Sequence, residues 1–191
     1  MAILIDVQTF RPILKESKTN PGVFEVEGIM QRAGAKNQNG RVYDKRILQR
    51  EVDKYIQEFV KNGNAYGELD HPESAIVSLK NASHVVKELW WNGEELMGRL
   101  ELLNTPSGNI VKEIIRGGHT IGISSRGTGS VQQTNEGTLE VQPDFELVCW
   151  DFVSNPSTHG AFMHAISLNE AKGLTSKFSK LDNIINDILR A

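Results

Sequence analysis

Short hydrophobic runs alternate with polar turns along most of the 191-residue chain. Residues 23–30 alternate apolar and polar side chains, and this period of two predicts a half-buried strand. Residues 85–91 and 96–102 predict a β-hairpin, because Asn92-Gly93 between them can adopt the positive φ angles that a two-residue turn requires. Further short strands are predicted at 120–123, around Val131, around Leu139 and at 145–153.

Two internal segments have helical spacing. Apolar residues recur on one helical face between Asp44, a suitable N-cap, and Gly63, a suitable terminator. Residues 106–115 predict a second helix, capped by Thr105 and followed by two glycines. Many short strands with few helices indicate an α+β fold, with an antiparallel β-barrel or sheet core surrounded by helices.

The pattern divides the chain into three parts. Residues 1–22 predict an extended arm, residues 23–165 the main domain, and residues 166–191 an amphipathic helix whose apolar positions step by four and three. That helix either docks on its own core or binds a partner, and the pattern leaves both alternatives open.

Charge and cysteine content narrow the function classes. A net charge of −3 gives no basic surface for nucleic acid, so we expect no nucleic-acid partner. No apolar run approaches the roughly 20 residues of a membrane span, and the N-terminus lacks the basic start of a signal peptide, so we expect no membrane association. The single cysteine, Cys149, excludes an internal disulfide and predicts a buried, inert thiol.

Candidate chemistry begins at the Gly122–Gly127 segment, which contains Ser124, Ser125 and Arg126 after a short predicted strand. A serine held rigidly at a strand can act as a nucleophile, and Arg126 can support an oxyanion. Adjacent strand residues face opposite sides, so only one of the two serines can face a given base. The alternative is an ordinary polar turn.

His71 is the candidate base, since it lies between acidic residues and Pro72, which favours an extended, rigid backbone. Asp151 is the best candidate to orient it, because an isolated carboxylate in an apolar run needs a partner if it is buried. His159 and Glu68 remain alternative third members. A metal site formed by Glu68, Asp70 and His71 is a weaker alternative, since it lacks a second histidine at ligand spacing; we therefore expect neither metal nor cofactor.

The pairing of Gly67-Glu68-Leu69-Asp70-His71-Pro72 with Gly122-Ile123-Ser124-Ser125-Arg126-Gly127 resembles the prohead core protein proteases of T4-like tailed bacteriophages. Supporting segments are 39–43, Trp90-Trp91, 134–137 and 151–157, and the resemblance covers residues 23 to 160. It implies a fold similar to that of the herpesvirus maturation proteases. It also matches His71 to the family's histidine, Ser124 to its nucleophile and Asp151 to its third member, with Arg126 near the oxyanion. The second histidine of the herpesvirus relatives keeps His159 as an alternative to Asp151.

The resemblance implies a serine endopeptidase inside the procapsid in the host cytoplasm, which cuts scaffold or core proteins, the major capsid protein and itself. We expect a homo-oligomer. Cleavage after glutamate in a Leu/Ile-x-Glu pattern predicts self-cleavage after Glu16 and Glu170, in exposed and loosely held backbone, so that the arm and the C-terminal helix are removable. A catalytically silent capsid or tail protein of the same fold is the alternative function.

Overall fold

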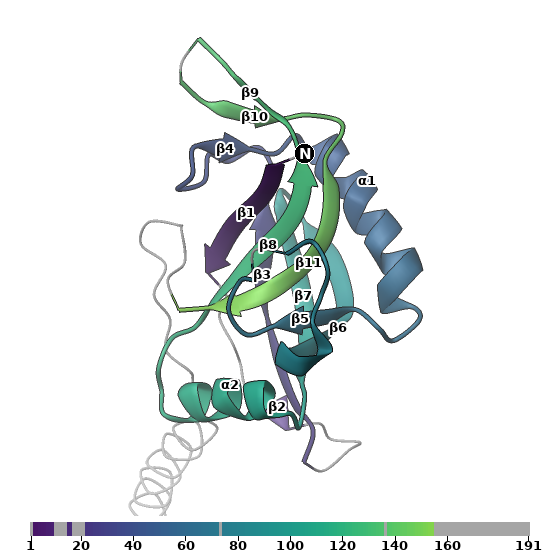
Figure 1. Cartoon of the computed structure of the whole chain (residues 1–191), viewed down its shortest axis with the longest axis vertical. Coiled ribbons are helices and arrows are strands. Elements are labelled where there is room, and N and C mark those ends of the chain that lie inside the picture. Colours follow the sequence, from purple (N-terminus) through teal and green to yellow (C-terminus); the bar gives the residue numbers. More distant parts are fainter. Residues whose placement is uncertain (1, 10–14, 17–21, 73, 136, 155–191) are drawn as a thin grey trace, which may run out of the picture.

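The structure is a computed structural model that describes residues 2–9, 15–16, 22–72, 74–135 and 137–154 (Figure 1). Its strands form three sheets. The first has the order β1 (Ala2–Thr9), β8 (Gly122–Gly129), β11 (Glu146–Val153), and both of its strand pairs are antiparallel.

The second sheet has five antiparallel strands. Their order is β2 (Lys15–Glu16), β3 (Phe24–Arg32), β7 (Glu95–Leu102), β6 (Ala82–Asn92), β5 (Tyr66–Glu68). The third sheet is small and has the order β4 (Arg41–Val42), β10 (Leu139–Val141), β9 (Val131–Gln133), with β4 and β10 parallel.

In the described part of the chain, two α-helices accompany the sheets. Helix α1 (Lys45–Tyr55) begins where the Asp44 carboxylate accepts a hydrogen bond from the Arg46 amide at 2.8 Å, and it continues as a π-helical turn, η1 (Ile56–Val60). Helix α2 (Pro106–Arg116) begins at Thr105, whose hydroxyl accepts from the Gly108 amide at 3.1 Å. A 3-10 turn, η2 (Leu79–Asn81), precedes β6. Figure 1 shows α1 beside the sheets and α2 at the end far from β9 and β10.

One hydrophobic core joins these elements. It takes side chains from the β1-β8-β11 sheet, from the five-stranded sheet and from the inner face of α1, among them Leu4, Ile123, Trp150, Val26, Leu100, Leu48 and Val52. Burying each such side chain contributes about 1.5–3 kcal/mol of transfer free energy, so this shared core holds the two larger sheets together.

The expected α+β architecture is confirmed, with mostly antiparallel sheets and two α-helices. The predicted hairpin is present between β6 and β7, but its turn is displaced by one residue: Asn92 still pairs with Glu95, so Gly93 and Glu94 form the turn, and only Gly93 has a positive φ, of +60°. The expected barrel is not seen in the described residues, since none of the three sheets closes on itself. Of the helices that the structure describes, none is long and apolar enough to cross a membrane.

Residues 2–9 of the predicted arm form an edge strand of the first sheet. Strand β1 pairs with β8 along its whole length, from Ala2 opposite Gly129 to Thr9 opposite Gly122, and Leu4 is buried in the core. Backbone pairing and burial of Leu4 therefore make residues 2–9 part of a central sheet. The predicted C-terminal helix lies outside the described residues.

Candidate active site

The candidate site is built on the pairing of β8 with β11. Asp151 lies directly opposite Ser124, and Cys149 lies opposite Arg126. Residues two apart on a strand share a face, and so do directly opposed residues on antiparallel neighbours. The four side chains therefore lie on one face of the sheet. Ser125 is paired with Trp150 and faces the other side.

His71 reaches this face from the second sheet. After β5, Leu69 forms a parallel bridge with Phe152, and the Asp70 amide donates to the Phe152 carbonyl at 2.8 Å. Asp70 has φ of +63°, an uncommon backbone conformation that Asp tolerates better than most residues. This turn carries His71 over β11, where its Nδ1 lies 2.9 Å from Oδ2 of Asp151.

Asp151 is fully buried and has partners on both oxygens. Its Oδ1 accepts a hydrogen bond from the Glu68 amide at 2.9 Å, and its Oδ2 lies 3.0 Å from Nε of Arg126. Burial alone raises the pKa of Asp151, but the hydrogen bond to His71, the charge of Arg126 and the Glu68 amide outweigh it, so that the pKa lies below its ordinary value. The carboxylate is therefore ionised at neutral pH.

Arg126 is also fully buried, beneath Asp151. Its guanidinium lies 2.7 Å from Oε1 of Glu68 and donates to the Ser74 carbonyl at 2.6 Å and to Sγ of Cys149 at 3.1 Å. Burial opposes its charge, but the carboxylates of Asp151 and Glu68 raise the pKa of Arg126 above its ordinary value. The carboxylates of Asp151 and Glu68 and the guanidinium of Arg126 thus form one buried ion cluster.

Several buried polar atoms at the site have no hydrogen-bond partner within the described residues. They include Oε2 of Glu68, and also Oγ of Ser124 and Nε2 of His71. A buried polar atom without a partner costs about 1–3 kcal/mol, so such atoms tend to persist where they serve a function. The atoms on Ser124 and His71 belong to the two residues that flank Asp151.

Close packing behind the site involves Gly67 and His84. A Cβ at Gly67 would collide with the Trp150 carbonyl and the His84 ring. His84 is completely buried, its Nδ1 is hydrogen-bonded to the Ser83 hydroxyl at 2.9 Å, and its ring packs against Phe152 at 4.6 Å. Burial lowers the pKa of His84 to about 4, so it is neutral at neutral pH.

The structure thus brings together five of the residues singled out in the sequence: Ser124, His71, Asp151, Arg126 and Glu68. Glu16 is not among them. It lies in β2, which is separated from β5 by the other three strands of its sheet, and its backbone pairs with Phe24. The loosely held backbone expected at Glu16 is therefore not observed. His159 and Glu170 lie outside the described residues.

The metal alternative finds no support in the described part of the chain, where no group of three or more His, Cys, Asp or Glu side chains is arranged to hold an ion. Glu68 is instead committed to Arg126, and its Oε1 also accepts from the Ser78 amide at 3.0 Å. The Glu68 carboxylate therefore joins the ion cluster to the segment that follows His71.

Sequence reasoning missed two residues of this site. Cys149 was expected to be inert, and its pKa is indeed raised by burial, yet its Sγ lies 3.3 Å from Asp151 as part of the cluster. The spacing of two residues between Cys149 and Asp151 on one strand was the available signal. His84 lies just before the predicted hairpin strand 85–91, in the part of β6 that the prediction did not include, and nothing in the sequence indicates its contact with Gly67.

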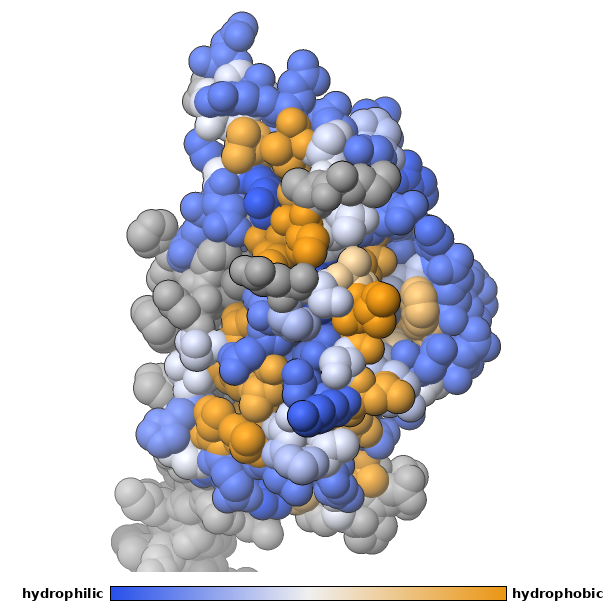
Figure 2. Space-filling view, in the orientation of Figure 1, coloured by the Kyte–Doolittle hydropathy of each residue, from blue (hydrophilic) through white to orange (hydrophobic). Residues whose placement is uncertain are grey.

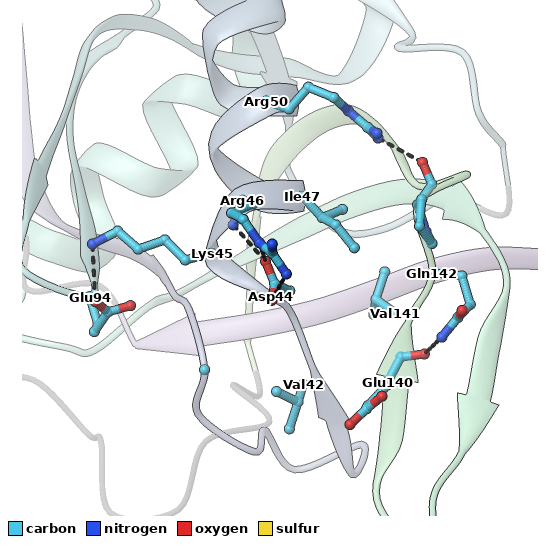
Figure 3. Close-up of a pocket in the computed structure, with 12 residues that line it drawn as sticks. Val42, Asp44, Lys45, Arg46, Ile47, Arg50, Glu94, Glu140, Val141 and Gln142 are labelled. Atoms are coloured by element: carbon cyan, nitrogen blue, oxygen red, sulfur yellow. Dashed lines mark hydrogen bonds and ion pairs between the residues drawn. The ribbon is translucent and has the colours of Figure 1, made fainter.

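A separate cavity of about 690 Å³ lies at the start of α1. Figure 3 shows Lys45 pointing at Glu94, Arg46 paired with Asp44, and Arg50 directed to a backbone carbonyl, that of Pro143 at 2.8 Å. None of its lining residues belongs to the candidate site.

Comparisons with known proteins show the family to which this chain belongs. The family model described as "Prohead core protein serine protease" matches residues 9–173. The prohead core protein protease of Enterobacteria phage T4 is 37% identical over 161 residues, which are 83% of this chain and 76% of that protein. The solved structure of the bacteriophage T4 capsid assembly protease superposes with a TM-score of 0.76 at 33% identity, over 81% of this chain and 98% of that one. The chain therefore belongs to the prohead core protein serine protease family.

Proposed function

We propose that this protease uses Ser124 as its nucleophile, His71 as its general base and Asp151 to orient His71. The observation that carries the proposal is the hydrogen bond between His71 Nδ1 and Asp151, whose strand partner is Ser124; His71 Nε2 and Ser124 Oγ both have no partner among the described residues. An ionised carboxylate at Nδ1 keeps the proton on that nitrogen, so that Nε2 is free to accept one.

In the reaction that follows, Oγ of Ser124 attacks the carbonyl carbon of the substrate and its proton passes to Nε2 of His71. The tetrahedral intermediate collapses when His71 returns that proton to the leaving amine, which leaves an acyl-enzyme. A water molecule then attacks the acyl carbonyl carbon while His71 takes its proton. The Ser124 oxygen leaves and receives that proton from His71, which releases the acid product. Asp151 remains ionised throughout and stabilises the imidazolium that forms twice in the cycle.

Arg126 has a supporting role in this proposal, because its guanidinium is buried among Glu68, Asp151 and the Ser74 carbonyl. The oxyanion role expected from the sequence would require those contacts to be exchanged for the substrate. Its support is electrostatic: a cation 3.0 Å from Asp151 keeps that carboxylate ionised although it is buried. Ser125, on the opposite face with Trp150, supports the sheet and does not face His71.

The substrates proposed for the chain are proteins of the assembling capsid, its scaffold or core and its major capsid protein, cut inside the procapsid after glutamate in Leu/Ile-x-Glu segments. The support for this is the family membership and the names of the two relatives, a prohead core protease and a capsid assembly protease. Self-cleavage after Glu16 would require β2 to separate from β3, because the Glu16 backbone is paired.

Mass spectrometry of the purified chain over time tests the nucleophile. Wild type should shorten at glutamates, Ser124→Ala should stay whole, and Ser125→Ala should shorten like wild type. Since each triad member contributes by a factor of about 10⁴ or more, His71→Ala should be as inactive as Ser124→Ala. Activity in Ser124→Ala with loss in Ser125→Ala would refute the assignment of Ser124 as the nucleophile.

If wild type stays whole even when mixed with scaffold protein, a catalytically silent capsid protein becomes the better explanation. EDTA should leave the rate unchanged, and a loss would favour the metal alternative.

A further inference from the structure

Helix α2 carries apolar residues on two sides. Its inner side, with Val111 and Ile115, is buried in the core and lies against β6 and β7. Its outer side borders an open hollow of about 500 Å³, in which Ile110 is 51% exposed. Figure 2 shows hydrophobic surface over this part of the molecule, at the lower left, where Figure 1 places α2. The core needs only one apolar side of a surface helix, so the second side is available to a further element.

The outer side of α2 has a shape that a second helix fits. Pro106, Ile110 and Ile114 follow one another at intervals of four residues, so they form a straight ridge along the helix surface. Ridges of this kind pack into the grooves of a neighbouring helix. The ridge ends at His119, whose amide donates to the Ile114 carbonyl at 3.1 Å. In the part of the chain that the structure describes, Pro106 and Ile110 are exposed, so the start of the ridge is uncovered there.

The chain leaves the described part of the structure close to this hollow. The described residues end at Ser154, and Val153, the last residue of β11, is paired with Gly122. Gly122 lies three residues after His119, a distance of at most about 10 Å, and paired strands are about 5 Å apart. The sequence that follows Ser154 therefore starts about 15 Å or less from the end of the ridge.

That sequence contains a segment that complements the ridge. Residues 174–188 predict an amphipathic helix, whose apolar positions are Leu174, Phe178, Leu181, Ile185 and Ile188. As a helix these positions would extend over about 21 Å, which is enough to cover the ridge from residue 106 to residue 114, about 12 Å long. The connection formed by residues 155–173 is long enough to place the segment on α2 in either direction.

We propose that residues 174–188 form a helix that docks on the outer side of α2 of the same chain, with its apolar positions against Pro106, Ile110 and Ile114. The segment then binds its own domain, and residues 155–173 form a loop that is held at both ends. Glu170 lies in that loop. A cut after Glu170 would therefore leave the helix attached to the protease by these contacts alone. This last consequence rests on the proposed function, whereas the docking itself does not.

Hydrogen exchange of the full chain, read by mass spectrometry, tests the docking. The chain carries Ser124→Ala, which is inactive under the proposed function, and is kept at low concentration. Amides of residues 174–188 should exchange about 10-fold or more slowly than in an unstructured peptide, because an isolated helix of this length is marginal in water and docking would hold it. Ile110→Asp and Phe178→Asp should each remove that protection, since either one places a charge in the apolar contact.

Two matched controls place the same charge elsewhere. Asn183→Asp lies on the polar side of the predicted helix, opposite the apolar positions. Ile76→Asp replaces another exposed isoleucine, at 79%, which lines a different groove. Both controls should keep the protection of residues 174–188. Exchange in β6 and β7 should be the same in every chain, which shows that the domain remains folded.

Three results would overturn the inference. The first is a segment 174–188 that exchanges as fast as an unstructured peptide in the starting chain. The second is protection that survives Ile110→Asp or that Ile76→Asp removes, since the segment would then dock elsewhere. The third is protection that disappears on dilution while sedimentation velocity shows a dimer, since the outer side of α2 would then be an interface between copies. None of these results bears on the nucleophile, which the cleavage experiment tests separately.

Discussion

The buried His84 should make the stability of this protein depend on pH well above the range in which carboxylates titrate. Burial lowers the pKa of His84 from 6.5 to about 4 in the folded chain, whereas the unfolded chain has the ordinary value. Between these two pH values the unfolded chain binds a proton that the folded chain does not. The contribution of neutral His84 to the free energy of unfolding is therefore fully present above pH 6.5 and is lost as the pH falls towards 4.

The magnitude follows from the two pKa values. Each unit of pKa shift corresponds to about 1.4 kcal/mol, so the full effect is about 3 kcal/mol. Most of it falls between about pH 7.5 and pH 5, where the linkage relation predicts a loss of about 2 kcal/mol. Asp151 also makes the folded chain less stable as the pH falls, because its pKa is lowered in the folded state. Its effect begins only as the pH approaches the ordinary aspartate pKa of 3.8.

Urea denaturation at a series of pH values measures this effect. All variants are made in the Ser124→Ala background, which is inactive under the proposed function, and His84→Gln in that background removes the titrating group. His84→Gln should be less stable at neutral pH, because the His84 ring packs against Phe152 and Gly67. Between about pH 7.5 and pH 5, however, its free energy of unfolding should fall by about 2 kcal/mol less than that of the chain with His84. His119→Gln controls for removal of one histidine. The same pH dependence in the His84→Gln chain would refute the reasoning.

Three further predictions concern the buried cluster. Arg126→Met leaves Asp151 and Glu68 buried without their cation and should lower the free energy of unfolding by about 3–5 kcal/mol in urea denaturation; a loss below about 1 kcal/mol would contradict the ion-cluster interpretation. Gly67→Ala should abolish proteolysis of a reporter protein and lower the melting temperature, because the new methyl group has no room against the Trp150 carbonyl and the His84 ring; an active, equally stable variant would show that this packing is not required. The Cys149 thiol should react with a disulfide reagent such as DTNB only as fast as the chain unfolds, since burial removes access and raises its pKa. Fast labelling of the folded chain would contradict this.

Local interactions account for what the sequence predicted well. The hairpin signal at Gly93, the Asp44 and Thr105 caps and the alternation in residues 23–30 each depend on neighbours a few positions away, and the corresponding hairpin, helices and strand are all present, with the hairpin turn one residue later than predicted. The candidate residues were likewise recognisable by type, since a rigid histidine, a serine pair and an isolated aspartate in an apolar run are unusual locally.

Contacts between distant segments decided the rest. The pairing of β1 with β8 could not be inferred, because residues 2–9 are short and apolar and the partner strand lies more than a hundred positions away. The one-residue difference between Ser124 and Ser125 depends on the register with β11, which a shift of a single residue would reverse. The sequence by itself determined the elements and the supply of reactive side chains. Only the tertiary structure decided which of them meet, because the buried cluster of Glu68, Arg126 and Asp151 joins three strands whose register is set by packing of the whole core.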